Sequence, residues 1–230
     1  EMVFRHDNGR APAEEIYTNG TQPYFRAPHI YVALPRRFMK QRTVLSDNEA
    51  EELRISREGQ WESCSDTVLM TSRGGNVYDR TFLEAFMTPG ADRRNWASRA
   101  GTPGTGVVQT GEREMSIYRN EHYASPSVHL KRYSLRLDGF TSLRAGYSGG
   151  CMRTRPLTFS GTRLDLNYAT SAAGHVRVEI QELSGKPVPG YGLDDCVVLI
   201  GDEIDRTVTW KDRDTIEDLI DRPVRFLFEL

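Results

Sequence analysis

Three stretches of the sequence decide the fold: EMSIYRNEH (114–122), HLKRYSLRLDGFTSLRAG (129–146) and MRTRPLTFSGTRLDLNYATSAAGHVRVEI (152–180). Within the first two, we predict strands over 115–119 and 129–137. Asp138-Gly139 has the composition of a tight hairpin turn, so we expect it to close a hairpin there. The diglycine at 149–150 then opens a new structural unit.

The third stretch shows the clearest alternation of apolar and polar residues. Leu164, Leu166 and Tyr168 share one face of an extended segment, because side chains alternate sides along a strand. In the same way, Val176, Val178 and Ile180 are expected on one face of the next strand. Turns are predicted at 172–174 and 185–187, and further strands around Val208 and Trp210 and over 224–228, with Trp210 in the core.

Composition favours an all-β protein and excludes several classes of function. The chain has 230 residues, a net charge of -2, twenty glycines and eleven prolines, which suits one large or two small domains with many turns. The near-neutral charge gives no bulk attraction to nucleic acid or to an anionic membrane. No apolar run is long enough for a transmembrane helix, so we expect a soluble globular protein.

The region before residue 114 mixes short strands with long loops. Strands are predicted over 30–34 and 66–71, and Gly74-Gly75-Asn76 supplies a hairpin turn. Ser46 and Glu49 form a capping box ahead of a short helix from Glu49 to about Ile55. Residues 87–113 form a loop rich in glycine and proline, and loops of this length inside a compact domain are usually functional.

Segments across the chain carry a resemblance: YTNGTQPYFRAPHIYVALPRRF (17–38), VLMTSRGGNVYDRTFLEAFMTPG (68–90), NWASR (95–99), TGEREMSIYRNEHY (110–123), HLKRYSLRLDGFTSLRAGYSGG (129–150), RPLTFSG (155–161), TSAAGHVRVEIQ (170–181) and GDEIDRTVTW (201–210). On these segments the chain resembles a family of uncharacterised bacterial proteins related to the five-bladed β-propeller glycoside hydrolases of families 32, 43, 68 and 117.

The resemblance implies an all-β chain in which residues 1–146 form the C-terminal blades of a β-propeller and residues 147–230 form a β-sandwich domain. It implies a glycoside hydrolase in a secreted or periplasmic location, although no signal peptide is recognisable in the sequence. The partner would be an oligo- or polysaccharide. It also implies that this chain is the second part of a longer protein, whose missing N-terminal blades carry the nucleophile or base carboxylate.

Glycoside hydrolysis requires two carboxyl groups, one of which acts as an acid of raised pKa. The best acid candidate is Glu114 at the start of a strand, and its alternative role is to pair with Arg99 or Arg132. The second candidate is Glu84. Its aromatic neighbours could half-bury the carboxyl group, and this would raise its pKa. Its alternative is a carboxylate paired with an arginine.

Several residues are predicted to bind the sugar. In family 43 the acid often lies in a Glu-x-Pro tripeptide, but here the tripeptide is Arg26-Ala27-Pro28, followed by His29. An arginine cannot protonate a leaving group at neutral pH, but Arg26 and His29 near the propeller axis suit an anionic sugar such as a uronate or a sulfated residue. The alternatives are a structural salt bridge and a core histidine. Arg73 belongs to a turn that resembles the small repeat of sialidase-like propellers.

The remaining binding candidates are Trp96, Arg99 and His122. Trp96, like Tyr24, could stack on a pyranose ring, with core packing as the alternative. Arg99 lies in the same long loop as Trp96. His122 follows a predicted strand, where it could bind hydroxyls or tune a carboxylate.

No metal or cofactor site is predicted outright. An acidic group near the C-terminus comprises Asp194, Asp195, Asp202, Glu203 and Asp205. A solvated acidic face is the favoured interpretation of this group, and a structural calcium ion is the other. The three cysteines, Cys64, Cys151 and Cys196, form no CxxC pair, so we expect no zinc site. We expect all three to be buried thiols. Two other functions stay open: a non-catalytic carbohydrate-binding protein and a structural or assembly protein.

Overall fold

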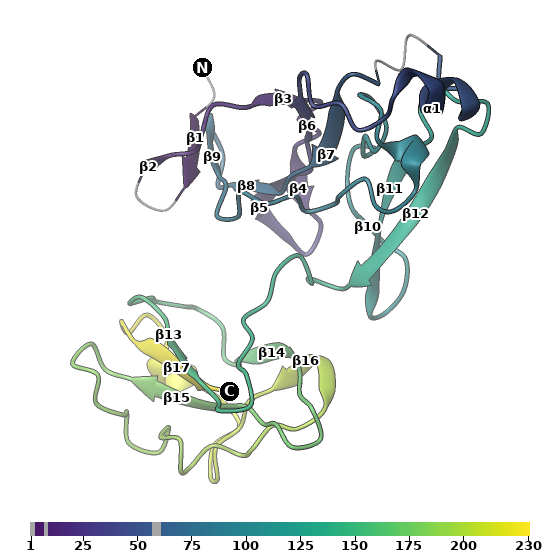
Figure 1. The fold of residues 1–230 in the computed structure, drawn as a ribbon. Coiled ribbons are helices and arrows are strands. Elements are labelled where there is room, and N and C mark those ends of the chain that lie inside the picture. The colour runs from purple at the N-terminus through teal and green to yellow at the C-terminus, as the bar shows by residue number, and fades with distance from the viewer. Residues whose placement is uncertain (1–2, 7–8, 57–60) are drawn as a thin grey trace. The chain divides into compact units, whose positions relative to one another are not determined.

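The computed structural model describes residues 3–6, 9–56 and 61–230 and confirms the expectation of an all-β chain (Figure 1). Small, mostly antiparallel sheets make up the described part, with very little helix. The chain divides into two compact units, Glu1–Arg136 (unit 1) and Leu137–Leu230 (unit 2). Among the described residues, no helix has the length and apolar character needed to cross a bilayer.

The described residues of unit 1 form three sheets. The first has the order β2 (Gly9–Arg10), β1 (Val3–His6), β9 (Val77–Asp79), β8 (Met70–Ser72), β5 (Ala27–Ala33) and β4 (Gln22–Tyr24). The second is β3 (Glu15–Tyr17), β6 (Arg36–Met39) and β7 (Cys64–Thr67), and the third is β10 (Val108–Gln109), β11 (Glu114–Glu121) and β12 (His129–Arg136). All of these pairs are antiparallel except β1 with β9. We detected no propeller in the part of the chain that the structure describes.

Most of the strands predicted in unit 1 are confirmed. The predicted segment 30–34 lies largely in β5, 115–119 lies in β11, and 129–137 matches β12. The single strand predicted over 66–71 is wrong, because β7 pairs with β6 while β8 pairs with β5 in a different sheet. The hairpin predicted at Asp138-Gly139 is also wrong, since β12 pairs with β11 through the loop that precedes it.

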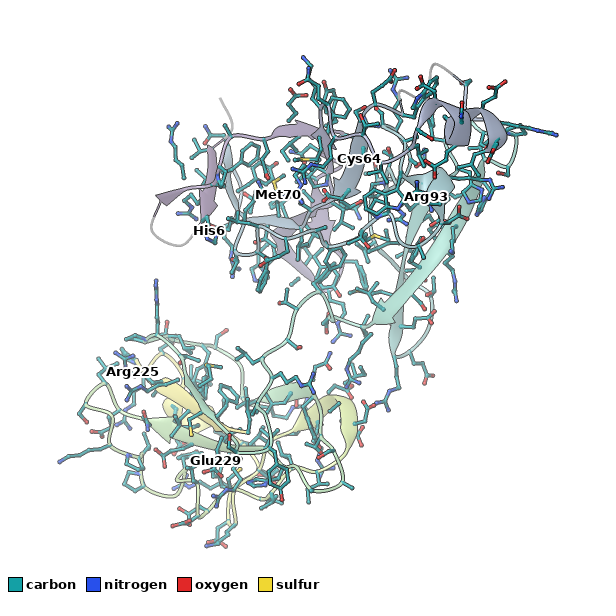
Figure 2. The ribbon with its side chains drawn as sticks, in the orientation of Figure 1. His6, Cys64, Met70, Arg93, Arg225 and Glu229 are labelled. Carbon is teal, nitrogen blue, oxygen red and sulfur yellow. The ribbon has the colours of Figure 1, made fainter. Side chains whose placement is uncertain are left out.

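The predicted helix is confirmed, with its capping box. Helix α1 (Asp47–Glu52) begins after Ser46, whose hydroxyl accepts the N–H of Glu49, while the Glu49 carboxylate accepts the N–H of Ser46. This reciprocal pairing satisfies two backbone donors that a helix start leaves open. Arg93 of the short 3-10 helix η2 (Arg93–Asn95) pairs with Glu49, so the loop after residue 87 is anchored to α1. Figure 2 labels the Arg93 side chain.

Unit 2 contains two sheets around its own core. One has the order β13 (Cys151–Arg153), β17 (Arg225–Glu229) and β15 (Arg177–Gln181), and the other pairs β14 (Asp165–Ala169) with β16 (Asp202–Thr207). The predicted alternation is confirmed, because Val176, Val178 and Ile180 are all buried. Trp210 is 2% exposed and its Nε1–H donates to the carbonyl of Val178, which confirms it as a core residue.

The division between the units falls ten residues before the predicted boundary at 146/147. Leu137 is buried, and its carbonyl oxygen accepts a hydrogen bond from Asn167 Nδ2 at 2.7 Å, so the chain joins unit 2 as soon as β12 ends. Farther on, Gly150 and Leu230 exchange backbone hydrogen bonds.

All three cysteines are free thiols, and their surroundings differ. Cys64 and Cys196 are buried, and burial raises the pKa of both thiols. Cys151, at the start of β13, is exposed, so the prediction of three buried thiols is wrong at this position.

Candidate functional site

Glu114, the predicted acid, is the first residue of β11 and is partly exposed. Its Oε1 accepts a hydrogen bond from Thr110 Oγ1 at 2.8 Å and lies 3.3 Å from Arg132 Nη1. Arg132 lies on β12 opposite Tyr118, and it is one of the two partners that the alternative interpretation named. The geometry therefore makes Glu114 a paired surface carboxylate that solvent can still reach.

Glu84, the second catalytic candidate, lies in an irregular segment after β9 and is exposed. The expectation that aromatic neighbours half-bury it is wrong, because Glu84 is exposed and the neighbouring Phe82 is itself 47% exposed. Glu84 and Glu114 therefore come from different segments, one outside the sheets and one at a strand start.

Three of the predicted binding residues lie on one sheet of unit 1 and are exposed. Arg26 is in the turn between β4 and β5, and Arg73 is in the turn between β8 and β9. His29 is an exposed residue of β5, so the alternative of a core histidine is wrong. Their binding of a sugar stays a prediction.

The predicted stacking residues both pack inside unit 1. Trp96 packs against the cluster that contains Leu45 and Ala50, and its Nε1–H donates to Gly90 O at 2.9 Å. Tyr24 is 8% exposed and its ring contacts Phe25, with centroids 4.7 Å apart. Core packing, the alternative interpretation, describes both rings in this structure.

Arg99 does lie in a group of residues that converge from four segments of unit 1. Arg36 of β6 lies over the ring of Tyr17, its cross-strand partner on β3, at 5.3 Å from the centroid. Arg99 lies over the ring of Tyr123 at 5.8 Å and donates to its hydroxyl at 3.2 Å. We refer to Tyr17, Arg36, Arg99 and Tyr123 as the arginine–tyrosine cluster.

Thr102 joins the two halves of this cluster. Its hydroxyl accepts a hydrogen bond from Arg36 Nη1 at 3.1 Å and donates to the carbonyl of Arg99 at 3.0 Å. Asn120 fixes the same turn, because its Oδ1 accepts the backbone N–H of Thr102 at 2.7 Å. The end of β11 therefore holds the loop that carries Arg99.

The electrostatics of the cluster favour an anion. Burial and the positive charge of Arg99 lower the pKa of Arg36, and the phenols of Tyr17 and Tyr123 only partly oppose this. The Nε of Arg36 is buried without a hydrogen-bond partner, which is costly for a charged group. A carboxylate or sulfate beside the two guanidinium groups would relieve the repulsion between them, since guanidinium groups bind such anions through paired hydrogen bonds.

A small cavity of about 140 Å³ is lined by residues that are close in sequence to the cluster, although no cluster residue itself lines it. Three segments line the cavity, and each comes within two residues in sequence of Tyr17, Arg36 or Thr102. The lining residues are Thr18, Asn19, Gly20 and Gln22; Val32 and Leu34; and Pro103, Gly104, Thr105, Gly106 and Val107. Gly106 has a φ of +102°, and a Cβ at this position would meet the Gln22 side chain. The loop can therefore close against β4 only with glycine there.

A buried ionic group lies on β11 and β12. Glu121 accepts hydrogen bonds from Arg119 Nη2 at 2.9 Å and from the hydroxyl of Tyr133, with Lys131 Nζ at 3.4 Å. Burial alone would raise the pKa of Glu121, but the hydrogen bonds from Tyr133 and Arg119 and the charge of Lys131 outweigh it and lower the pKa to about 2. Glu121 is thus a fixed anion at neutral pH and cannot act as an acid.

Sequence reasoning missed this ionic group, although a signal was present. Arg119 and Glu121 continue the period-two series of Met115 and Ile117, which are buried. Side chains at alternate positions share one face of a strand. The series therefore could have placed both charges on the buried face of β11.

His122, a predicted binding residue, is hydrogen-bonded on both sides of its ring. Its Nε2 lies 2.9 Å from Asp92 Oδ2, and its Nδ1 lies 2.9 Å from Ser127 Oγ. The ring of His129 meets it edge-on, with centroids 4.8 Å apart. We refer to Asp92, His122 and Ser127 as the histidine relay.

The acidic residues near the C-terminus do not converge. Asp194 pairs with Arg177 at 3.8 Å and Asp195 with Lys211 at 3.6 Å, while Asp202, Glu203 and Asp205 lie on β16. Across the ranges that the structure describes, no group of three His, Cys, Asp or Glu side chains is arranged to hold a metal ion.

Comparisons with protein-family models, with curated proteins and with solved structures found no significant match to this chain.

Proposed function

We propose that this chain is a carbohydrate-active protein that binds an anionic glycan at the arginine–tyrosine cluster. The observation that carries the proposal is the placement of Arg36 close enough to Arg99 for the charge of Arg99 to lower the pKa of Arg36. A uronate carboxylate or a sulfate between the two guanidinium groups would receive charge-assisted hydrogen bonds. The exposed ring of Tyr17 next to Arg36 offers a face for the apolar side of a pyranose.

The proposal includes the finer fold and the setting expected from the sequence. Unit 1 would be blades of a β-propeller and unit 2 a β-sandwich, in a secreted or periplasmic protein whose other blades lie outside this chain. The observation that supports a two-part organisation is the division of the chain into two units, each with sheets of its own. Fold analogy alone does not specify an activity, so the function rests on the cluster.

Glycan binding is better supported than hydrolysis. A glycosidase needs two carboxyl groups that flank one bond, whereas Glu114 is paired with Arg132 and Glu84 lies on an exposed irregular segment. A glycoside hydrolase with part of its active site outside this chain stays a prediction. In that case Glu114→Gln in the longer protein should abolish the release of reducing sugar ends.

The proposal is tested by calorimetric titration with three oligosaccharides of equal length: an oligogalacturonate, a sulfated oligosaccharide and a neutral one. We expect the anionic sugars to bind and the neutral one to bind at least tenfold more weakly, with affinity that falls as salt is added. Arg36→Gln and Arg99→Gln should each weaken binding about tenfold to a hundredfold, because each removes hydrogen bonds to a charged group.

The matched control is Arg206→Gln on β16, which removes an exposed arginine from unit 2. Its affinity should equal that of the unaltered chain. Equal binding of neutral and anionic sugars, or an equal loss in all three variants, would contradict the proposal.

A further inference from the structure

The histidine relay has the connectivity of an activated serine nucleophile. Asp92 Oδ2, His122 and Ser127 Oγ are joined by two contacts of 2.9 Å. Such a nucleophile requires a hydroxyl within hydrogen-bond reach of a base, and a third group that orients the base. The proposed glycan site uses none of these three residues.

The protonation states of the relay follow from the charge on Asp92. Burial alone would raise the pKa of this carboxyl, but hydrogen bonds from the Arg94 N–H and from His122 outweigh it and lower the pKa. Asp92 is therefore an ionised acceptor, so His122 must carry its proton on Nε2. In the neutral imidazole the Nδ1 of His122 is then an acceptor, and Ser127 Oγ–H donates to it.

The loop between β11 and β12 holds these groups in place. His122 has a φ of +56°, which is uncommon for a residue other than glycine, and its N–H donates to Asn95 Oδ1 at 3.0 Å. Its carbonyl accepts the N–H of Ser125 at 3.0 Å. Backbone conformations of this kind occur preferentially at functional sites.

Ser127 is accessible while its base is largely covered. Ser127 is exposed, whereas the His122 side chain is 12% exposed. The Ser125 hydroxyl lies 3.2 Å from Ser127 Oγ, so Ser127 Oγ has a second hydrogen-bond partner besides the imidazole of His122. An electrophile can therefore approach Ser127 from solvent.

We propose that Ser127 is a nucleophile toward small acyl esters, with His122 as general base and Asp92 as the group that orients it. Ser127 Oγ forms a bond to the acyl carbon while its proton moves to His122 Nδ1. The ester C–O bond then breaks, and His122 returns that proton to the leaving alkoxide to release the alcohol. Water, deprotonated by His122, attacks the acyl-serine, and the departing Ser127 oxygen recovers the proton.

The test is labelling of the whole chain with a fluorophosphonate, with the modified residue located by peptide mass spectrometry. We expect phosphonylation at Ser127, and at least a tenfold slower rate in His122→Gln and in Asp92→Asn. Hydrolysis of 4-nitrophenyl acetate should fall in parallel. Ser134→Ala, at an exposed serine of β12, is the control and should label like the unaltered chain.

A second variant keeps the proposal testable if those changes disturb the loop. In Ser127→Cys, the new thiol should react with iodoacetamide at least tenfold faster than the exposed Cys151 at pH 7. Label spread over Ser125 or Ser134 in place of Ser127, or a Ser127→Cys thiol no faster than Cys151, would overturn the proposal. Neither assay contains a glycan, so its outcome is independent of the proposed binding function.

Discussion

At the scale of single residues, the buried carboxylate of Glu121 allows a sharp stability prediction. Removing one member of a buried ion pair leaves its partner uncompensated, at a cost of about 3 kcal/mol or more. Glu121→Gln should therefore lower the free energy of unfolding of β11 and β12 by about that amount, measured by amide hydrogen exchange. Glu114→Gln on the same strand breaks only a partly exposed pair and should cost less than about 1 kcal/mol.

The same carboxylate predicts a dependence on pH. Because folding lowers the pKa of Glu121 from its usual 4.5 to about 2, its contribution is complete above about pH 4.5 and is lost as the pH falls toward 2. The difference in stability between the unaltered chain and Glu121→Gln should shrink over that interval. A difference that stays constant down to pH 2 would contradict the assignment.

Residue-level prediction from the sequence did not identify the arginine–tyrosine cluster as a group, for a physical reason. Arg99 was identified as a binding candidate, but its partner Arg36 was not, and Arg26 was proposed instead. The arginine–tyrosine cluster forms from residues 17, 36, 99 and 123, which meet only when two strands and two loops have folded. No spacing of residue types within a short stretch of sequence predicts such a group.

At the scale of elements, the loop of residues 103–107 depends on glycine at one position. Gly106 has a φ of +102° and lies against the Gln22 side chain. Gly106→Ala should destabilise unit 1 by about 1–3 kcal/mol, because the backbone conformation is strained for a residue with a Cβ. It should also weaken anionic glycan binding, since the loop follows Thr102. Gly111→Ala, where φ is not positive, is the control for the same β10 region, and an equal loss there would refute the argument.

Strands were easier to predict than their partners. Alternation and turn residues are local signals, so the strands β5, β11, β12 and β15 and the capping box of α1 could be placed from sequence. Sheet membership depends on pairing between distant segments, such as β5 with β8. That is why the segment 66–71 was predicted as one strand although it contributes to two sheets.

At the scale of the whole molecule, unit 2 has a core of its own, built around Trp210 and Tyr191, whose rings lie 5.1 Å apart. We expect the fragment 137–230 to unfold cooperatively, with a blue-shifted Trp210 fluorescence that is lost on heating. The fragment 147–230 should be less stable, because it lacks the buried Leu137 and its hydrogen bond to Asn167. Equal stability of the two fragments would favour the boundary expected from sequence.

The unequal burial of the three thiols makes the molecule suitable for site-specific spectroscopy without prior mutation. A maleimide should attach first to Cys151, because the thiols of Cys64 and Cys196 are buried and raised in pKa. One fluorophore or spin label would then report from β13 alone. With a second label on an introduced cysteine in unit 1, resonance energy transfer or pulsed dipolar spectroscopy would follow the separation of the units as a glycan is added.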